Sequence, residues 1–187
     1  MTVTRLPRTI RLDPSDTFVF EHPAEPGEWA VTGSFLFLDA DPATLSGKAR
    51  AAFRSGFAGV SSLGFSTLVV VSEASPAEVE DATATLARHI RDKLGAPDDE
   101  SARAAAEEEI AAAASLCGPP VNTVLAMHRT LEDGQLREQF RTLTPKEPSL
   151  PGSDRLHASL RVFQFVEADD EPEERIDLAG LMAEKPA

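Results

Sequence analysis

Hydrophobic and polar residues recur along the chain with two different periods, and the changes between them divide the sequence into strands and helices. Short runs rich in β-branched and aromatic residues predict strands. Other segments carry apolar residues about every 3.6 positions, begin after a capping residue and end near a glycine, which predicts helices. We expect strands over 9–12, 17–21, 29–38, 65–71 and 157–166, and helices over 41–57, 75–94 and 98–116.

The segment 123–143 gives the most specific local prediction, because an Asp-Gly pair at 133–134 separates two strand-like runs. Asp-Gly in a two-residue loop favours a type I′ turn, and this turn fixes the pairing register of the hairpin. The register places apolar side chains and one ion pair on one face, and polar side chains on the other. The facing residues are Leu131 and Leu136, Arg129 and Glu138, Met127 and Phe140, and Leu125 and Thr142.

The order of these elements predicts an α+β protein. The most economical assembly is a single mixed, mostly antiparallel sheet with about three helices packed mainly on one face. The segments 29–38 and 65–71 would be joined by a right-handed crossover if they lay parallel in that sheet. We expect residues 1–166 to form one domain and residues 167–187, which are rich in acids, to form a flexible acidic tail.

The charge of the chain is unevenly distributed. Its 187 residues have a formal net charge of −13. Residues 73–110 contain eleven acidic and four basic side chains, and residues 167–187 contain eight and two. Binding to nucleic-acid phosphates requires clustered Lys and Arg, so this balance argues against a nucleic-acid partner. The same sign argues against anionic membrane surfaces.

The cysteine content and the hydrophobic runs bear on the compartment. A lone cysteine, Cys117, permits no intramolecular disulfide, and no apolar run approaches the roughly 20 residues that span a membrane. No apolar signal segment follows the basic N-terminus. These features are typical of a cytoplasmic bacterial protein. Cys117 follows a predicted helix C-terminus, where the helix dipole disfavours a thiolate, so we interpret it as a buried or half-buried structural thiol.

No sequence motif indicates a catalytic site, a cofactor or a metal. Glycines over 56–64 follow a helix and precede a strand, whereas a phosphate-binding loop leads from a strand into a helix. The acidic runs 98–100 and 107–109 lie on a predicted helix, where consecutive side chains point in different directions, so we interpret them as solvated. The four histidines lack the spacing of metal ligands, and they are His22, His89, His128 and His157.

One group of side chains is a candidate binding surface. His128, Arg137 and Arg141 would share the polar face of the hairpin, beside Thr130 and Gln139. In a protein this acidic, such a basic strip could bind a carboxylate, a phosphate group or the acidic tail of the chain itself. The alternative interpretation is an ordinary solvent-facing strand surface.

Three segments resemble an uncharacterised proteobacterial family, known as a domain of unknown function. They are Gly-Glu-Trp-Ala-Val-Thr-Gly-Ser-Phe-Leu-Phe-Leu-Asp over 27–39, Phe-Arg-Ser-Gly-Phe over 53–57 and Gly-Phe-Ser-Thr-Leu-Val-Val-Val over 64–71. The resemblance covers nearly the whole chain and implies no activity and no catalytic residue.

The sequence therefore favours a non-catalytic binding or accessory module that uses no cofactor. It would act through contact with another protein or with a second copy of itself. The alternative is an enzyme with a dispersed site that acts on a small anionic substrate. The residues of that site would come from His22, His128, His157, Arg137 and Arg141.

Overall fold

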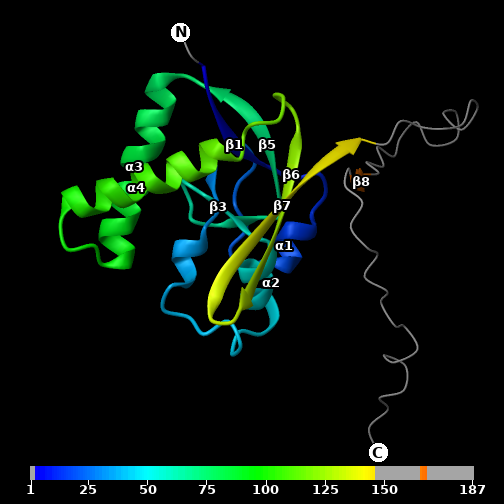
Figure 1. Ribbon diagram of the computed structural model, residues 1–187, viewed down its shortest axis with the longest axis horizontal. Helices are drawn as coiled ribbons and strands as arrows, with labels where there is room; N and C mark the ends of the chain where they lie inside the picture. The colour runs from blue at the N-terminus through cyan, green and yellow to red at the C-terminus, as the bar shows by residue number, and fades with distance from the viewer. Residues whose placement is uncertain (1–2, 146–164, 168–187) are drawn as a thin grey trace, which may run out of the picture.

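The computed structural model describes residues 3–145 and 165–167, which form two antiparallel sheets and four α-helices (Figure 1). The larger sheet has five strands in the order β1-β5-β6-β7-β8, and the smaller has three in the order β2-β3-β4. The α+β class is thus confirmed. The arrangement differs from the single mixed sheet that we expected, because the strands divide between two sheets and every strand pairing is antiparallel.

The elements have the following bounds. The larger sheet contains β1 (Thr4–Ile10), β5 (Leu68–Ala74), β6 (Val124–Glu132), β7 (Gln135–Pro145) and β8 (Phe165–Glu167). The smaller sheet contains β2 (Ala30–Val31), β3 (Phe57–Gly59) and β4 (Phe65–Ser66). The helices are α1 (Ser15–Val19), α2 (Gly47–Ser55), α3 (Pro76–Leu94) and α4 (Asp99–Ser115), and a 3₁₀ helix, η1, spans Ser34–Phe37.

The β6–β7 hairpin has the predicted register, with Arg129 opposite Glu138 and Leu131 opposite Leu136. The turn residues at 133 and 134 have φ values of 51° and 75°, the left-handed pair that a type I′ turn requires. A slip of one residue would move every side chain to the opposite face. The Asp-Gly turn therefore decides which hairpin residues face the core.

The start and end of α3 follow from its sequence. The Ser75 hydroxyl accepts the backbone N–H of Glu78, and the Glu78 carboxylate accepts the backbone N–H of Ser75, which together form a capping box. Gly95 ends the helix in a left-handed conformation with φ 74°. These signals fix the length of the helix before any tertiary contact is made.

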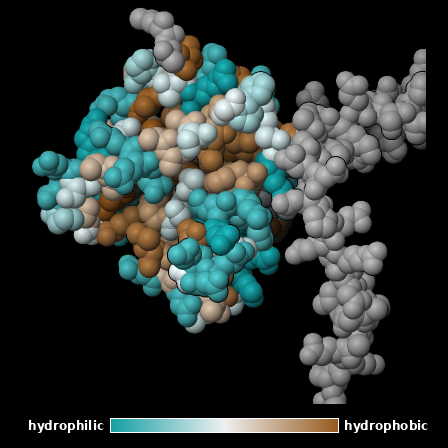
Figure 2. Space-filling model, viewed as in Figure 1, coloured by the Kyte–Doolittle hydropathy of each residue, from teal (hydrophilic) through white to brown (hydrophobic). Residues whose placement is uncertain are grey.

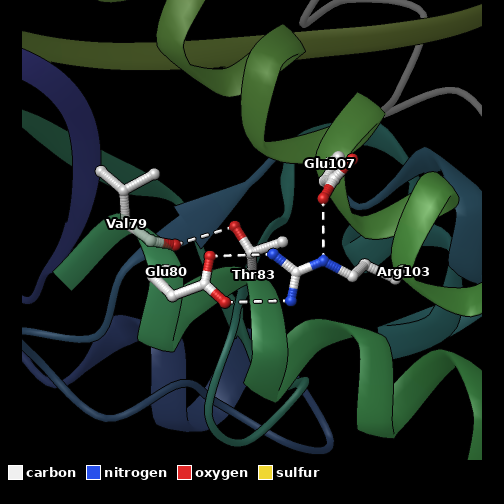
Figure 3. A network of polar contacts seen from close by, with 5 residues as sticks. All are labelled: Val79, Glu80, Thr83, Arg103 and Glu107. Carbon is white, nitrogen blue, oxygen red and sulfur yellow. Dashed lines mark hydrogen bonds and ion pairs between the residues drawn. The ribbon is translucent and has the colours of Figure 1, made fainter. Parts of the chain in front are cut away.

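Helices α3 and α4 pack together as a helical hairpin at one side of the molecule (Figure 1). On its surface, Arg103 of α4 donates through both Nη atoms to Glu80 of α3, at 2.9 and 2.8 Å, and through Nε to Glu107 at 2.9 Å (Figure 3). Exposed ion pairs contribute at most about 1 kcal/mol. The pairing therefore depends chiefly on buried apolar residues that include Ala82, Leu86, Ala102 and Ala106.

Two predicted strands take another form. The segment 17–21 belongs largely to α1, where the buried Asp16 carboxylate accepts the Thr67 hydroxyl at 2.6 Å and the Thr67 backbone N–H at 3.2 Å. The segment 29–38 is a strand only at Ala30–Val31, because Gly33 adopts φ 80° and leads into η1. The conditional crossover between 29–38 and 65–71 does not occur, because the chain between them forms β3, which lies between β2 and β4 and pairs antiparallel with both.

Other boundaries shift, and some predictions lie beyond what the structure describes. The helix expected over 41–57 begins only at Gly47 and ends at Ser55, and its last predicted residue, Phe57, begins β3 instead. The strand expected over 157–166 lies outside the described residues except for its last two, which belong to β8. The predicted tail, apart from residue 167, is also outside them. The division into one domain and a tail stays a prediction.

The core consists of two apolar clusters. One joins α3 and α4 to Leu6, Val31 and Val60, and the other joins β5 and β6 to Phe57 and Cys117. Burial raises the pKa of the Cys117 thiol to about 11, in agreement with its interpretation as a structural residue. In the part of the chain that the structure describes, no helix is long and apolar enough to cross a membrane.

We expect Gly33→Ala to destabilise the protein by at least about 1 kcal/mol more than Gly27→Ala does. Both glycines have positive φ, 80° and 91°, so both variants carry the cost of a left-handed alanine. Only at Gly33 would the new methyl group also lie 2.9 Å from the Cβ of Ala58, whereas Gly27 has open space around it. Urea unfolding measures the difference, and equal losses would contradict the close approach.

Candidate functional site

A cavity of about 750 Å³ opens between η1, the C-terminal end of α3 and α4. Its walls are mainly apolar and include Phe35, Leu36 and Ile90. Leu38 and Leu94 also line it and are 82% and 43% exposed. Figure 2 shows hydrophobic surface on the side where the helical hairpin and η1 meet. Exposed apolar side chains beside an apolar cavity are typical of a binding site.

The charged groups of this cavity are mostly acidic. Asp39, Glu108 and Glu109 line it, with Lys93 as the one basic residue among the lining residues. The three carboxylates come from the segment after η1 and from α4. An apolar cavity with this charge balance favours a ligand that has an apolar body and a positive group.

Glu109 differs from the other two carboxylates because it is half-buried. Burial, with smaller contributions from the negative charges of Glu138 and Glu108, raises its pKa to about 7. The positive charge of Arg129 opposes this shift. The carboxyl group therefore changes charge near neutral pH, which is a common property of groups that bind cations or exchange protons.

Helix geometry explains why neighbouring glutamates in 107–109 have different surroundings. Glu107 points to the surface, where it contacts Arg103, and Glu108 is exposed at the cavity. Glu109 lies three residues after the buried Ala106 and four before the buried Ala113, so it faces the interior. The expectation that this acidic run is solvated is therefore wrong for Glu109.

The guanidinium of Arg129 is completely buried, and it does not line the cavity at η1. Its Nε donates to Glu138 Oε1 at 2.9 Å. Its Nη1 donates to the Phe53 carbonyl at 2.7 Å, and its Nη2 donates to the Thr32 carbonyl at 2.5 Å. Burial lowers the pKa of Arg129, and the contact with Glu138 opposes that shift. The predicted ion pair is thus present, and it lies in the core.

The three residues that we singled out on the hairpin share one face. Arg137 lies opposite Thr130, and Arg141 lies opposite Ala126, on either side of the pair formed by His128 and Gln139. Arg137 is exposed and makes an ion pair with Glu132 at 2.9 Å. His128 and Arg141 are half-buried. None of the three lines the cavity at η1, and their role as a binding surface stays a prediction.

The histidines do not meet at this cavity. The ring Nε2 of His89 lies 2.9 Å from the Ser61 carbonyl, and His128 belongs to the hairpin, while His157 is outside the described residues. No histidine lines the cavity. Among the described residues, no group of three or more His, Cys, Asp and Glu side chains is placed to hold a metal ion.

Glu109 and the burial of Arg129 were missed by the sequence reasoning. The sequence does contain a signal for Glu109, because its position continues the buried stripe formed by Ala102, Ala106 and Ala113. A similar signal marks Arg129, because the predicted register places it on the apolar face between Met127 and Leu131. Its carbonyl acceptors, by contrast, lie 76 and 97 residues away in the chain.

We expect Arg129→Met to destabilise the protein by about 3–5 kcal/mol, because it leaves the Glu138 carboxylate and two carbonyl groups without their donor. Replacing Glu138 by Leu in the same protein should recover part of this loss, since it removes the uncompensated charge. Urea unfolding of the two variants tests this. A loss below about 1 kcal/mol for Arg129→Met would contradict a core role for the ion pair.

We expect Glu109→Gln to change the pH dependence of stability. The folded protein keeps the Glu109 proton up to a pH of about 7, while the ordinary pKa is 4.5, so the charged group disfavours folding increasingly between these values. The carboxyl remains partly open to water, so we expect a relative gain for Glu109→Gln of about 1–2 kcal/mol across this range. Chemical unfolding at several pH values measures it. Glu107→Gln is the control on the same helix, and parallel profiles for Glu109→Gln and wild type would disprove the effect.

Comparisons with known proteins identify the family of this chain. No curated protein and no solved structure matches the chain. A family model described as "Family of unknown function (DUF6505)" matches residues 3–160. The matched range contains the cavity at η1, Arg129 and the β6–β7 hairpin. The chain therefore belongs to this family of unknown function.

Proposed function

We propose that the protein is a cytoplasmic binding module that acts through protein–protein contact. Its cavity at η1 would receive a segment of a partner protein that carries apolar side chains and one basic side chain. The observation that carries this proposal is the half-buried carboxyl of Glu109 in the wall of a mainly apolar cavity whose other charged residues are mostly acidic.

The apolar part of the proposed contact rests on Leu38 and Leu94. Leu38 is 82% exposed and Leu94 is 43% exposed, although both border a cavity whose walls are mainly apolar. Full burial of a leucine side chain is worth about 1.5–3 kcal/mol. A partner that covered both residues would gain free energy that offsets part of the cost of ordering a short segment.

The electrostatic part rests on the acidic lining. A basic side chain near Glu109 would favour its ionised form, and the attraction would be strengthened by the limited access of water. Asp39 and Glu108 add negative charge to the same cavity. Two copies of this chain, each with a net charge of −13, would repel one another, so the charge favours a basic partner over self-association.

The competing hypothesis of an enzyme with a small anionic substrate gains no support from this cavity. Its acidic lining would repel such a substrate, and no histidine lies in its walls. A proton-transfer site would also need a second reacting group near Glu109. The binding role is therefore the simpler account of the cavity.

Selection of peptides from a random display library on the full-length chain tests the proposal. We expect the enriched peptides to combine a Lys or Arg with neighbouring apolar residues. Synthetic copies of them should bind Leu38→Asp about tenfold or more weakly than wild type, because burial of that leucine is lost. Glu109→Gln should also weaken binding, since the basic side chain loses its partner.

The matched control is Phe18→Asp, which introduces the same charge at an apolar side chain that is 72% exposed and does not line the cavity. It should leave peptide binding nearly unchanged. The proposal fails if no common sequence is enriched, or if the enriched peptides bind Leu38→Asp and wild type equally well.

A further inference from the structure

A second cavity, of about 380 Å³, lies between α2 and β6, and its charge is opposite to that of the first. Its lining includes Arg50, Arg54 and Arg129, and contains no Asp or Glu. The chain as a whole has 31 acidic and 18 basic residues, so a lining whose charged residues are all basic is unexpected from composition. This concentration of positive charge calls for an explanation.

Helix α2 supplies two of the three arginines. Arg50 and Arg54 are four residues apart, so both lie on the same side of the helix. The helix contains no acidic residue, and both side chains are exposed. Neither arginine makes an ion pair with any residue that the structure describes, whereas Arg91 and Arg103 each contact two carboxylates.

The third arginine is held rigidly by strand β6. Arg129 is anchored by Glu138 and by the carbonyl groups of Phe53 and Thr32, so its position at the cavity wall is fixed. Glu138 offsets much of its charge but does not line this cavity. Arg129 therefore forms a fixed wall of the cavity on the side of the core, and the exposed Arg50 and Arg54 line the cavity on the side of the solvent.

The remaining walls of the cavity are partly apolar. Pro42, Phe53 and Leu131 contribute to them, and Leu131 is 44% exposed. A bare inorganic ion would leave Pro42 and Leu131 in contact with water, whereas Phe53 is already buried. A ligand with an apolar body attached to its anionic group would cover them and gain the corresponding free energy.

From these observations we propose that the cavity between α2 and β6 binds a small organic anion, with its carboxylate or phosphate group on Arg50 and Arg54 and its apolar body against Phe53 and Leu131. Guanidinium groups bind both kinds of oxyanion through paired hydrogen bonds. The site differs from the basic face predicted from the sequence, because none of His128, Arg137 and Arg141 lines this cavity, and only Thr130 of that face does. It is also independent of the proposed partner-binding function.

Isothermal titration of the full-length chain with phenyl phosphate and with benzoate tests the proposal. We expect saturable binding of at least one of these probes. Arg50→Ala and Arg54→Ala should each weaken it about tenfold or more, because each removes hydrogen bonds to a charged group. The probe that binds with the higher affinity identifies the anionic group that the site prefers.

Two controls separate a specific site from general attraction. Lys48→Ala removes one positive charge from the same helix but lies outside the cavity lining, so it should retain wild-type binding. Leu131→Ser should weaken binding of the better aromatic probe and leave that of its small counterpart, inorganic phosphate or acetate, unchanged. Thermal unfolding verifies that each variant is folded.

The proposal is overturned if neither aromatic probe binds, or if Lys48→Ala loses as much affinity as Arg50→Ala. Leu38→Asp, which alters only the cavity at η1, should bind the probes as wild type does. A failure of the anion site is therefore distinguishable from a failure of the proposed partner-binding function.

Discussion

The guanidinium of Arg129 is removed completely from water, and the surrounding chain must therefore supply hydrogen-bond acceptors for it. It obtains them from three separate places: the end of α2, the residue that follows β2, and the neighbouring strand β7. A charge buried without such partners would cost several kcal/mol, which is a large part of the net stability of a domain. The geometry of Arg129 thus ties the smaller sheet and α2 to the β6–β7 hairpin.

The parts of the fold that could be predicted are those determined by neighbours in sequence. The Asp-Gly turn fixed the whole hairpin register, and Ser75 and Gly95 marked the ends of α3. The strand predicted over 29–38 was largely wrong, because its apolar pattern is equally compatible with a short strand followed by a 3₁₀ turn. The division into two sheets depends on pairings between distant segments, which hydrophobic periodicity does not specify.

In the candidate site, too, contacts between residues distant in sequence could not be predicted. The pairing of Arg129 with Glu138 followed from the hairpin register, but its burial depends on Phe53 and Thr32, which are remote in sequence. Glu109 was predictable in principle, since it continues the buried stripe of α4, yet the acidic run around it suggested a solvated face. A charged residue within an apolar stripe is thus more informative than the number of charges in its neighbourhood.

The strengths of the ion pairs indicate which charges matter for function. The pairs that Arg91 and Arg103 make on the helical hairpin are exposed, so water and salt reduce each of them to at most about 1 kcal/mol. Arg129, Glu138 and Glu109 interact where water is scarce, so a change of charge there alters pKa and stability strongly. Arg129 lines one cavity and Glu109 lines the other. The net charge of −13 dominates the sequence, but each of the two proposed binding sites has in its wall one of the few charges withdrawn from water.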